Sequence, residues 1–439
     1  MQSLIKVQVV LWLLIATVWG RDFHNGVTVD WGKQTIPKGN IHVWSNAIWS
    51  MINNHNAEFR GNIQVDNDAG LYVSSVTPKV CLHARMPSSK YGIVNNGVIS
   101  FNAIKGARNY RFKIMGNKFL NNGDFFLAGS GEGSVESYIK SRDWHNNGLL
   151  HVYQSMKSKS YTYLGYVRKT MVNNGQICFT NQNWKQHSIM LGKGCVTAQG
   201  KSSLYFKKTD LKISEDEIFY LSGGETSIMA VGSKKDPQTF HVRGFGTYDN
   251  GVANKIGLTG RLKSPAPGKT PWSYNARDGI LTLYHGLYHQ NFEIGTGYDF
   301  TKFQVVTDTS RGLPSVTLGA VQYNGPPPNA GMPGECKPCK AIPSIPGVSS
   351  EPQTYAIDTS GIAPISLDDS DDEKPVDDND DDSNDDSNDV SDDEGSDEQA
   401  DDSNDDADVS SAQEPVSIVK VIATAVVTAT AIQTATVSA

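Results

Sequence analysis

The tripeptide Asn-Asn-Gly recurs along this chain at a nearly constant interval. It ends at Gly97, Gly123, Gly148 and Gly175, so successive glycines lie 26, 25 and 27 residues apart. A fixed period of about 20 to 50 residues is typical of stacked supersecondary units, because one unit cannot bury its apolar face alone. A short run of β-forming residues follows each glycine, as in 98–101. The repeat therefore predicts an all-β fold, a parallel β-helix with coils of about 25 residues.

The asparagines and glycines of the repeat are expected to form the turns between coils. The same phase extends to Gly70 before the repeat and to Gly200, Gly224 and Gly251 after it. Asn and Gly tolerate a positive φ at little steric cost, so each Asn-Gly pair is expected in a turn that requires it. Stacked in register, the asparagines are expected to form an amide ladder, which is a structural role. The predicted turn residues are Asn96, Gly97, Asn122, Gly123, Asn147, Gly148, Asn174 and Gly175.

The first 20 residues have the features of a secretory signal peptide. Lys6 supplies positive charge, the segment 7–19 is mainly apolar, and Val18 and Gly20 are small enough for a cleavage site. The apolar segment is too short to span a bilayer. We therefore expect a secreted protein that begins near Arg21.

The rest of the chain divides by composition. We predict a β-helix domain at 21–240, in which the Trp-containing segment 21–65 is an N-terminal cap. Residues 241–328 contain alternating strands separated by Gly and Pro clusters and are expected to form a β-sandwich. Residues 329–415 are expected to be a disordered linker, Pro-rich and then acidic. Residues 416–439 form a weak hydrophobic tail.

Charge is divided unevenly along the chain. The net charge is −8, but the segment 368–408 alone holds 23 acidic residues and one base. The remaining sequence has 38 basic and 24 acidic residues, a net charge of +14. A basic body is attracted to anionic surfaces, which for a secreted protein are acidic glycans or phosphorylated mannan rather than nucleic acid. The alternative is that the acidic segment simply neutralises the body.

The cysteines of a secreted chain indicate disulfides, and five of them leave one unpaired. Cys178 and Cys195 lie within one coil, so a bridge across that coil is the first predicted pairing. Cys336 and Cys339 lie in a Pro-rich segment without a thioredoxin-like pattern, and they are expected to form a local bridge or to stay free thiols. Zinc would need more ligands than these two. Cys81 is the one left over.

The segment 416–439 is a candidate glycolipid-anchor signal. Such a signal needs small residues at the attachment site, a polar spacer and an apolar tail. Ser410 and Ser411 are the candidate attachment residues, although the tail contains several threonines, Lys420 and no leucine. The alternative is a soluble or non-covalently retained protein.

A set of short strings occurs in order across residues 21–330. They are Trp44-Ser45-Asn46-Ala47, Gly61-Asn62-Ile63, Gln176-Ile177-Cys178-Phe179-Thr180-Asn181, Leu191-Gly192-Lys193-Gly194-Cys195-Val196 and Tyr323-Asn324-Gly325-Pro326. Together with the Asn-Gly turns, they make the chain resemble the N-terminal domain of the hyphally regulated cell wall proteins of yeasts, a family of adhesin-like surface proteins.

This resemblance implies a right-handed β-helix followed by an α-crystallin-like β-sandwich. It also implies display on a fungal cell wall, usually through a glycolipid anchor beyond a long Ser/Thr-rich stalk, and adhesion to cells or surfaces. The chain departs from that plan, since a short Asp/Ser/Asn segment stands in place of the stalk. This departure supports residence in the wall more strongly than adhesion, because a head close to its anchor cannot extend through a thick wall.

Parallel β-helices also include polysaccharide lyases and hydrolases, so the fold alone does not exclude catalysis. A hydrolase needs two or three carboxylates on neighbouring coils. The densest carboxylates are Glu132, Glu136, Asp143 and the triplet 215–217. They are interpreted as solvated turn charges, since adjacent residues of a strand point to opposite faces. His285 and His289 follow a strand-like segment, where a spacing of four does not make a metal pair.

Aromatic residues in a Ser- and Lys-rich segment are the binding candidates. Tyr161, Tyr163 and Tyr166 lie within 157–169. Rings with nearby bases suit sugar stacking and anionic glycans, and they also suit the flank of a solenoid strand.

The sequence thus predicts a non-catalytic, extracellular fungal cell-wall protein whose basic β-solenoid head adheres to host, abiotic or fungal surfaces. The expected partner is cell-wall polysaccharide or another anionic glycan surface. No cofactor, metal or nucleic acid is expected, and a membrane is expected only through the candidate anchor. The alternatives are a secreted polysaccharide-active β-helix enzyme and a structural wall or matrix protein. Converging carboxylates would favour the enzyme, and a flat basic-aromatic face would favour adhesion.

Overall fold

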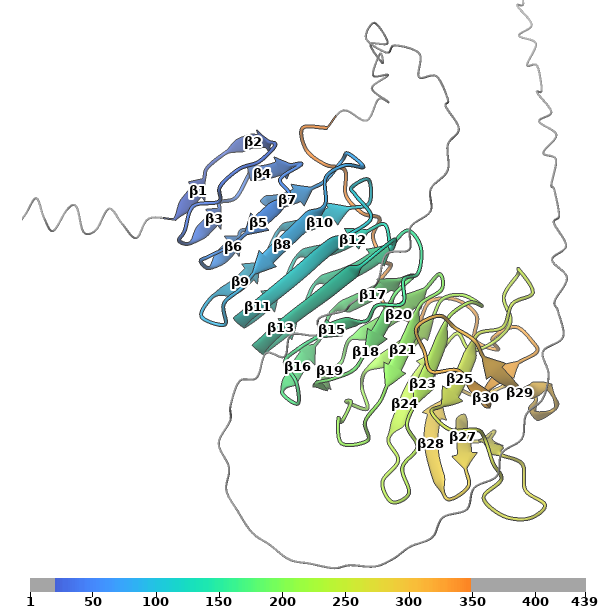
Figure 1. The fold of residues 1–439 in the computed structure, drawn as a ribbon. Coiled ribbons are helices and arrows are strands. Elements are labelled where there is room, and N and C mark those ends of the chain that lie inside the picture. The colour runs from blue at the N-terminus through green and yellow to red at the C-terminus, as the bar shows by residue number, and fades with distance from the viewer. Residues whose placement is uncertain (1–19, 349–439) are drawn as a thin grey trace, which may run out of the picture. The chain divides into compact units, whose positions relative to one another are not determined.

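The computed structural model describes residues 20–348, which form a parallel β-solenoid of about nine turns followed by antiparallel strands (Figure 1). These residues contain no α-helix, and one short 3-10 helix, η1, covers Phe300–Lys302. Two long sheets, called sheet A and sheet B, run along the solenoid and enclose its core.

Sheet B takes one strand from each coil. In sheet order its strands are β2 (Gly26–Trp31), β4 (Ala47–Ile52), β7 (Gly70–Ser74), β10 (Val98–Ala103), β12 (Asp124–Gly129), β14 (Leu149–Gln154), β17 (Gln176–Thr180), β20 (Cys195–Gln199), β22 (Ile218–Leu221), β24 (Thr239–Arg243), β28 (Tyr288–Glu293), β27 (Ile280–His285) and β26 (Trp272–Asn275). Pairing is parallel from β2 through β24 to β28, and the last three strands pair antiparallel.

Sheet A takes one or two strands from each coil. In chain order its strands are β1 (Arg21–Phe23), β3 (Ile41–Val43), β5 (Asn56–Glu58), β6 (Ile63–Val65), β8 (Leu82–Met86), β9 (Gly92–Asn95), β11 (Tyr110–Asn121), β13 (Val135–Asn146), β15 (Thr162–Leu164), β16 (Thr170–Asn173), β18 (Asn183–Lys185), β19 (Ile189–Gly192), β21 (Ser203–Phe206), β23 (Ser227–Ala230), β25 (Lys255–Leu258), β29 (Phe303–Asp308) and β30 (Val316–Tyr323). The strands β29 and β30 pair antiparallel, and β30 also pairs antiparallel with β25.

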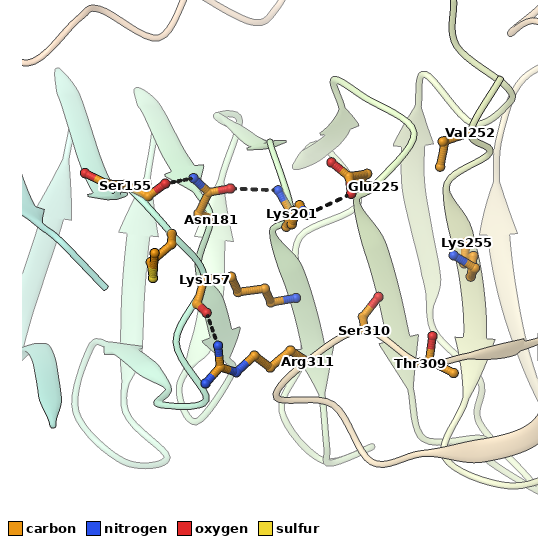
Figure 2. Close-up of a pocket in the computed structure, with 11 residues that line it drawn as sticks. Ser155, Lys157, Asn181, Lys201, Glu225, Val252, Lys255, Thr309, Ser310 and Arg311 are labelled. Carbon is orange, nitrogen blue, oxygen red and sulfur yellow. Dashed lines mark hydrogen bonds and ion pairs between the residues drawn. The ribbon is translucent and has the colours of Figure 1, made fainter. Parts of the chain in front are cut away.

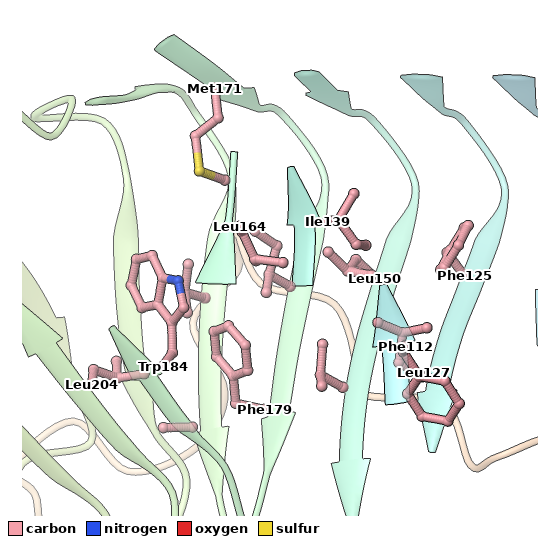
Figure 3. Packing of buried hydrophobic residues seen from close by; sticks show 14 of the residues in the cluster. Phe112, Phe125, Leu127, Ile139, Leu150, Leu164, Met171, Phe179, Trp184 and Leu204 are labelled. Atoms are coloured by element: carbon pink, nitrogen blue, oxygen red, sulfur yellow. The ribbon is translucent and has the colours of Figure 1, made fainter. Parts of the chain in front are cut away.

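Alternate residues of each strand point into the solenoid and form columns of equivalent positions across coils. Phe125, Leu150 and Ile177 occupy one such column of sheet B, and each is fully buried. Aromatic rings fill the space between the sheets, as where Phe179 stacks on Trp184 at 5.5 Å between centroids. Figure 3 shows part of this continuous apolar core. Stacking therefore buries a face that no single coil could bury alone.

The first asparagine of each repeat forms a ladder inside the solenoid. Asn95, Asn121, Asn146 and Asn173 are fully buried, and each of the first three donates its amide N–H to the next asparagine at 2.7–2.8 Å. The same three amides also donate to a backbone carbonyl of the next coil. Every buried amide N–H of these three side chains thus has a partner, as burial of polar groups requires.

The second asparagine of each repeat forms a separate, exposed ladder. Its members are the predicted turn residues Asn96, Asn122, Asn147 and Asn174. Asn122 donates to Asn96 and Asn147 donates to Asn122, each at 2.8 Å, and Asn174 donates to Asn147 at 3.4 Å. These bonds run toward the N-terminus, opposite to the buried ladder.

The positive φ predicted for the Asn-Gly pairs is wrong. None of the eight predicted turn residues, all within the described part of the chain, adopts it. The glycines meet a different requirement, since a Cβ on Gly148 would lie 2.0 Å from the Gly123 carbonyl oxygen, and a Cβ on Gly175 would lie 2.2 Å from that of Gly148. Successive coils approach backbone to backbone at this edge, which only Gly permits.

The predicted interval of about 25 residues between equivalent glycines holds only as far as Gly175. The next coil is only 19 residues long, because Gln176 of β17 pairs with Cys195 of β20. The predicted turn position is therefore wrong for Gly200, Gly224 and Gly251. These three glycines lie in turns that lead from sheet B to sheet A, whereas the Asn-Asn-Gly turns lead from sheet A to sheet B at the other edge of the solenoid.

Two predicted domain boundaries are also wrong. The segment 21–65 is no separate cap, because β1 to β4 already stack in parallel as the first coils. The ladder continues beyond residue 240 through β24 and β25. The antiparallel strands predicted within 241–328 are present, but they extend both solenoid sheets. The α-crystallin-like sandwich stays a prediction.

Residues 333–348, called the strap below, return along the outer surface of sheet B (Figure 1). Disulfides join Cys336 to Cys195 on β20 and Cys339 to Cys178 on β17. The predicted bridge between Cys178 and Cys195 is therefore wrong, as is a local bridge between Cys336 and Cys339. In the parallel register Cys178 and Cys195 are offset by two residues on neighbouring strands. That offset puts their Cα atoms about 8 Å apart, beyond the reach of a disulfide.

Polar contacts continue the strap toward the N-terminal coils. The ring of His151 lies 2.9 Å from the Lys340 carbonyl oxygen, and the Lys340 ammonium pairs with Asp124 at 2.7 Å. The Ser50 hydroxyl donates to the Pro346 carbonyl at 2.8 Å. The strap thus covers outward side chains of sheet B from β20 to β4. The first part of the predicted Pro-rich linker is therefore part of the folded head.

Several predicted segments lie outside the described residues. They are the signal peptide up to residue 19, the acidic segment 368–408, the candidate attachment residues Ser410 and Ser411, and the tail 416–439. Within 20–348, no helix has the length and apolar character needed to cross a membrane.

Glu217 ends the buried asparagine ladder. Its prediction as a solvated turn charge is wrong, since the side chain is fully buried. It accepts hydrogen bonds from the Asn173 amide at 2.6 Å and from the Gly194 N–H at 3.3 Å. Burial raises the pKa of Glu217 to about 8, although both hydrogen bonds act to lower it. The carboxyl therefore carries a proton in the folded head at neutral pH.

We expect this buried acid to make the head less stable as pH rises from about 5 to about 8. In that range the folded state retains the Glu217 proton, whereas the unfolded chain has released it, so the free energy of unfolding falls. Glu217→Gln should remove about 3 kcal/mol of the decrease in unfolding free energy between about pH 5.5 and 8.5, measured by urea unfolding at both pH values. The exposed neighbour is the control, and Glu215→Gln should leave the dependence unchanged. A Glu217→Gln variant that follows the wild-type pH curve would contradict this assignment.

Candidate surface-binding site

The outer face of sheet A carries rings and cations in register. Lys113 of β11 pairs with Tyr138 of β13, and Tyr138 pairs with Tyr163 of β15. Lys185 of β18 and Tyr205 of β21 continue the row on the next coils. Since alternate residues of a strand face outward, these side chains lie side by side across neighbouring coils.

Lysine ammonium groups lie against these rings. The Lys140 Nζ is 4.3 Å from the Tyr138 ring centroid and 5.8 Å from that of Tyr163. The Lys185 Nζ is 4.9 Å from the Tyr161 centroid. Such contacts are worth roughly 0.5–2 kcal/mol each and hold the charges beside the rings. The surface is called the basic-aromatic face below, and its residues are Lys113, Tyr138, Lys140, Arg142, Tyr161, Tyr163, Tyr166, Lys185, His187 and Tyr205.

The three tyrosines predicted for surface binding lie on this face. The rings of Tyr161 and Tyr163 are 6.3 Å apart and half-buried. Tyr166 is exposed, and its ring lies 5.5 Å from the Arg142 guanidinium. The Tyr161 hydroxyl also donates to the Gly312 carbonyl, which connects the face to the loop between β29 and β30.

The composition of residues 157–169 predicted one strand of the face and none of its neighbours. A spacing signal was present, because Lys113, Tyr138 and Tyr163 are each 25 residues apart and therefore occupy equivalent positions on successive coils. The signal fails for Lys185 and Tyr205, because the coil that follows is shorter.

The face has a net positive charge. The carboxylate of Glu136 lies beside the face and pairs with the Lys113 ammonium at 2.7 Å. Burial raises the pKa of both Tyr138 and Tyr163, so their hydroxyls stay protonated and can donate hydrogen bonds. Burial also lowers the pKa of Lys185. The arrangement offers rings, hydroxyl donors and cations on one surface.

Three of the carboxylates considered for catalysis each lie beside a basic side chain, whereas the triplet 215–217 forms no ion pair within the described residues. Glu132 pairs with an arginine at 3.1 Å, Glu136 with a lysine at 2.7 Å, and Asp143 with a histidine at 2.8 Å. His285 and His289 lie on opposite strands of the β27–β28 hairpin. In the described part of the chain, no three His, Cys, Asp or Glu side chains gather as a metal site.

A cleft of about 610 Å³ lies under the β29–β30 loop (Figure 2). The Arg311 guanidinium in this loop donates to the Lys157 carbonyl at 3.0 Å. On the opposite wall, Lys201 pairs with Glu225 at 3.2 Å. No local sequence pattern predicts this cleft, because segments far apart in the chain build it.

Residues 11–346 match a family model described as "Hyphally regulated cell wall protein N-terminal". The chain belongs to this family. The resemblance drawn from the sequence strings is confirmed. The matched region ends within the strap, so it includes the four cysteines of this chain that form the two disulfides.

Curated members of the family are similar to the chain over most of its length. Hyphally regulated cell wall protein 3 of Candida albicans is 37% identical over 362 residues, which are 82% of this chain and 28% of that protein. Cell wall protein IFF9 of the same organism is 38% identical over 334 residues, 75% of this chain and 34% of that protein. Hyphally regulated cell wall protein 1 is 35% identical over 340 residues, 76% of this chain and 35% of that protein.

The chain therefore spans about a third of the length of these relatives. Their names place the family in the cell wall, which confirms the predicted extracellular location.

Proposed function

We propose that this protein is a non-catalytic, adhesin-like component of the fungal cell wall whose head binds anionic polysaccharide through the basic-aromatic face. The observation that carries this proposal is the row of lysines and tyrosines in register across neighbouring coils. Tyrosine rings stack on sugars, and neighbouring ammonium groups attract phosphate or carboxylate groups. The face extends over several coils, which suits a polymer on a cell or surface better than a small substrate.

We propose that the candidate signal at Ser410 and Ser411 links the protein to the wall, and that the antiparallel strands close the solenoid as an α-crystallin-like sandwich. A polysaccharide-active enzyme finds less support, because Glu132 and Glu136 are ion-paired and Asp143 lies beside the ring of His145. A purely structural wall protein would need no such face.

We expect the double variant Lys140→Gln, Tyr163→Ala to bind yeast phosphomannan about tenfold more weakly than the wild type. The variant loses one cation and one ring at the centre of the face. Binding of the full chain to immobilised polymer is measured by biolayer interferometry, with dephosphorylated mannan as the neutral polymer.

The control changes the same residue types at exposed positions away from the face. The variant Lys269→Gln, Tyr288→Ala should bind phosphomannan like the wild type. Equal affinity of the two double variants, or equal binding of the wild type to the two polymers, would overturn the proposal.

A further inference from the structure

The cleft under the β29–β30 loop is assembled from distant segments. Its floor consists of the turns that lead from sheet B to sheet A on successive coils, and its roof is 309–311 (Figure 2). A second hollow of about 470 Å³ shares Met156 and Arg311 with it. The cleft therefore continues along the solenoid, with the half-exposed side chain of Met156 between its two parts.

Four cations line the cleft against one acid. Lys201 is paired with Glu225. Within residues 20–348, Lys157, Lys255 and Arg311 form no ion pair. These basic groups disfavour one another's positive charge in a partly enclosed space, the buried Asp308 carboxylate offsets part of that effect at Lys157, and an anion placed among them would offset more of it.

One of these cations is buried and reaches the cleft through hydroxyl groups. Lys157 is 6% exposed, and its ammonium donates to the Ser203 hydroxyl. The Ser203 hydroxyl oxygen lies 3.0 Å from that of Ser227, which lies 3.2 Å from that of Ser310 in the cleft lining. Since hydroxyls both donate and accept, this row can turn its donors toward an anion.

The pKa of Lys157 shows that its surroundings do not fully compensate the positive charge of the ammonium group. Burial lowers its pKa to about 7, the carboxylate of Asp308 acts against this, and Lys201 and Lys255 lower it further. Asp308 accepts the Ser310 N–H at 2.9 Å and forms no ion pair with Lys157 in the described residues. A bound anion would therefore favour the charged form of Lys157.

We infer that this cleft binds a phosphate group carried by a sugar. Lys157 and Arg311 lie toward one end of the cleft and hold the phosphate, Lys255 lies further along the cleft and adds positive charge, and the hollow beside Met156 receives the sugar. Guanidinium and ammonium groups form charge-assisted hydrogen bonds with phosphate oxygens, and the volume lies in the usual range of small-molecule sites. The choice of a sugar as carrier rests on the proposed function, whereas the choice of an anion rests on the cations alone.

Isothermal titration calorimetry of the full chain tests this site with mannose 6-phosphate, inorganic phosphate and mannose. We expect mannose 6-phosphate to bind, inorganic phosphate to bind more weakly, and mannose to give no heat. Lys255→Gln should weaken mannose 6-phosphate binding about tenfold, because it removes a cation that makes no ion pair within the described fold. Lys269→Gln carries the same charge change on an exposed loop and should bind like the wild type.

Two outcomes overturn the inference outright. They are the absence of mannose 6-phosphate binding at millimolar concentration, and equal affinity of Lys255→Gln and Lys269→Gln. Equal affinity for inorganic phosphate and mannose 6-phosphate would overturn the sugar part. The double variant of the basic-aromatic face should keep its mannose 6-phosphate affinity. Loss of that affinity with Lys255→Gln unaffected would place phosphate binding on the face, which supports the proposed function and refutes the cleft.

Discussion

Replacing Asn121 by alanine should destabilise the head by about 3 kcal/mol. The side chain is fully buried, donates to Asn146 and to the Leu149 carbonyl, and accepts from Asn95. Truncation leaves several buried polar groups without a partner in one step, and it adds a small cavity. The change is measured as the shift of the urea unfolding midpoint at constant slope.

The adjacent residue provides a matched control for this variant. Asn122 has the same side chain and the same kind of ladder bond, but its ladder is exposed. Water can replace the lost partners there, so Asn122→Ala should cost less than about 1 kcal/mol. If the two variants unfold at the same urea concentration, burial of the inner ladder is not what makes it stabilising.

Removing the bridge between Cys178 and Cys339 should cost about 4 kcal/mol in the variant Cys178→Ala, Cys339→Ala. The bridge joins residues 161 apart in sequence, so it restricts a large part of the unfolded chain. The second bridge, between Cys195 and Cys336, encloses nearly the same segment at a separation of 141. Removing all four cysteines should therefore cost less than twice as much. Thermal unfolding of the full chain, monitored by circular dichroism, measures both losses.

Cys81 is the control for the loss of a sulfur atom. It forms no bridge in the described residues, and Cys81→Ala should unfold near the wild-type temperature. A thiol assay should find one reactive group in the unfolded wild type and still one in the double variant. A double variant as stable as Cys81→Ala would show that the bridge between Cys178 and Cys339 contributes nothing to folding stability.

The repeat made the solenoid predictable because the same local rule applies on each coil. Once Gly97 and Gly123 are equivalent, the strands that follow them must stack, and the asparagines before them must meet. The prediction failed where a coil has a different length, since a single short turn before Cys195 changes the phase of everything after it. It also gave the wrong reason for the glycines, because the close approach of Gly123 to Gly148 exists only between coils.

The strap and the cleft could not be predicted from local patterns. Nothing in the Pro-rich composition of residues 333–348 indicates that Ile342 packs against Phe126 and Leu149 of sheet B. Lys157 and Arg311 meet only because the β29–β30 loop folds back on the solenoid. The basic-aromatic face was partly predictable, because one of its rows keeps the period of the coils.

The strap also determines how tension enters the head. A pull on the chain beyond residue 348 first peels the contacts at Ser50 and Asp124 one after another, which releases about 30 Å of slack. It then reaches the covalent bond from Cys339 to Cys178, and residues 179–338 lie inside the loop that this bond closes. Force therefore passes across that loop without unravelling it. A protein tethered at one end can in this way be pulled hard while the second half of its solenoid keeps its shape.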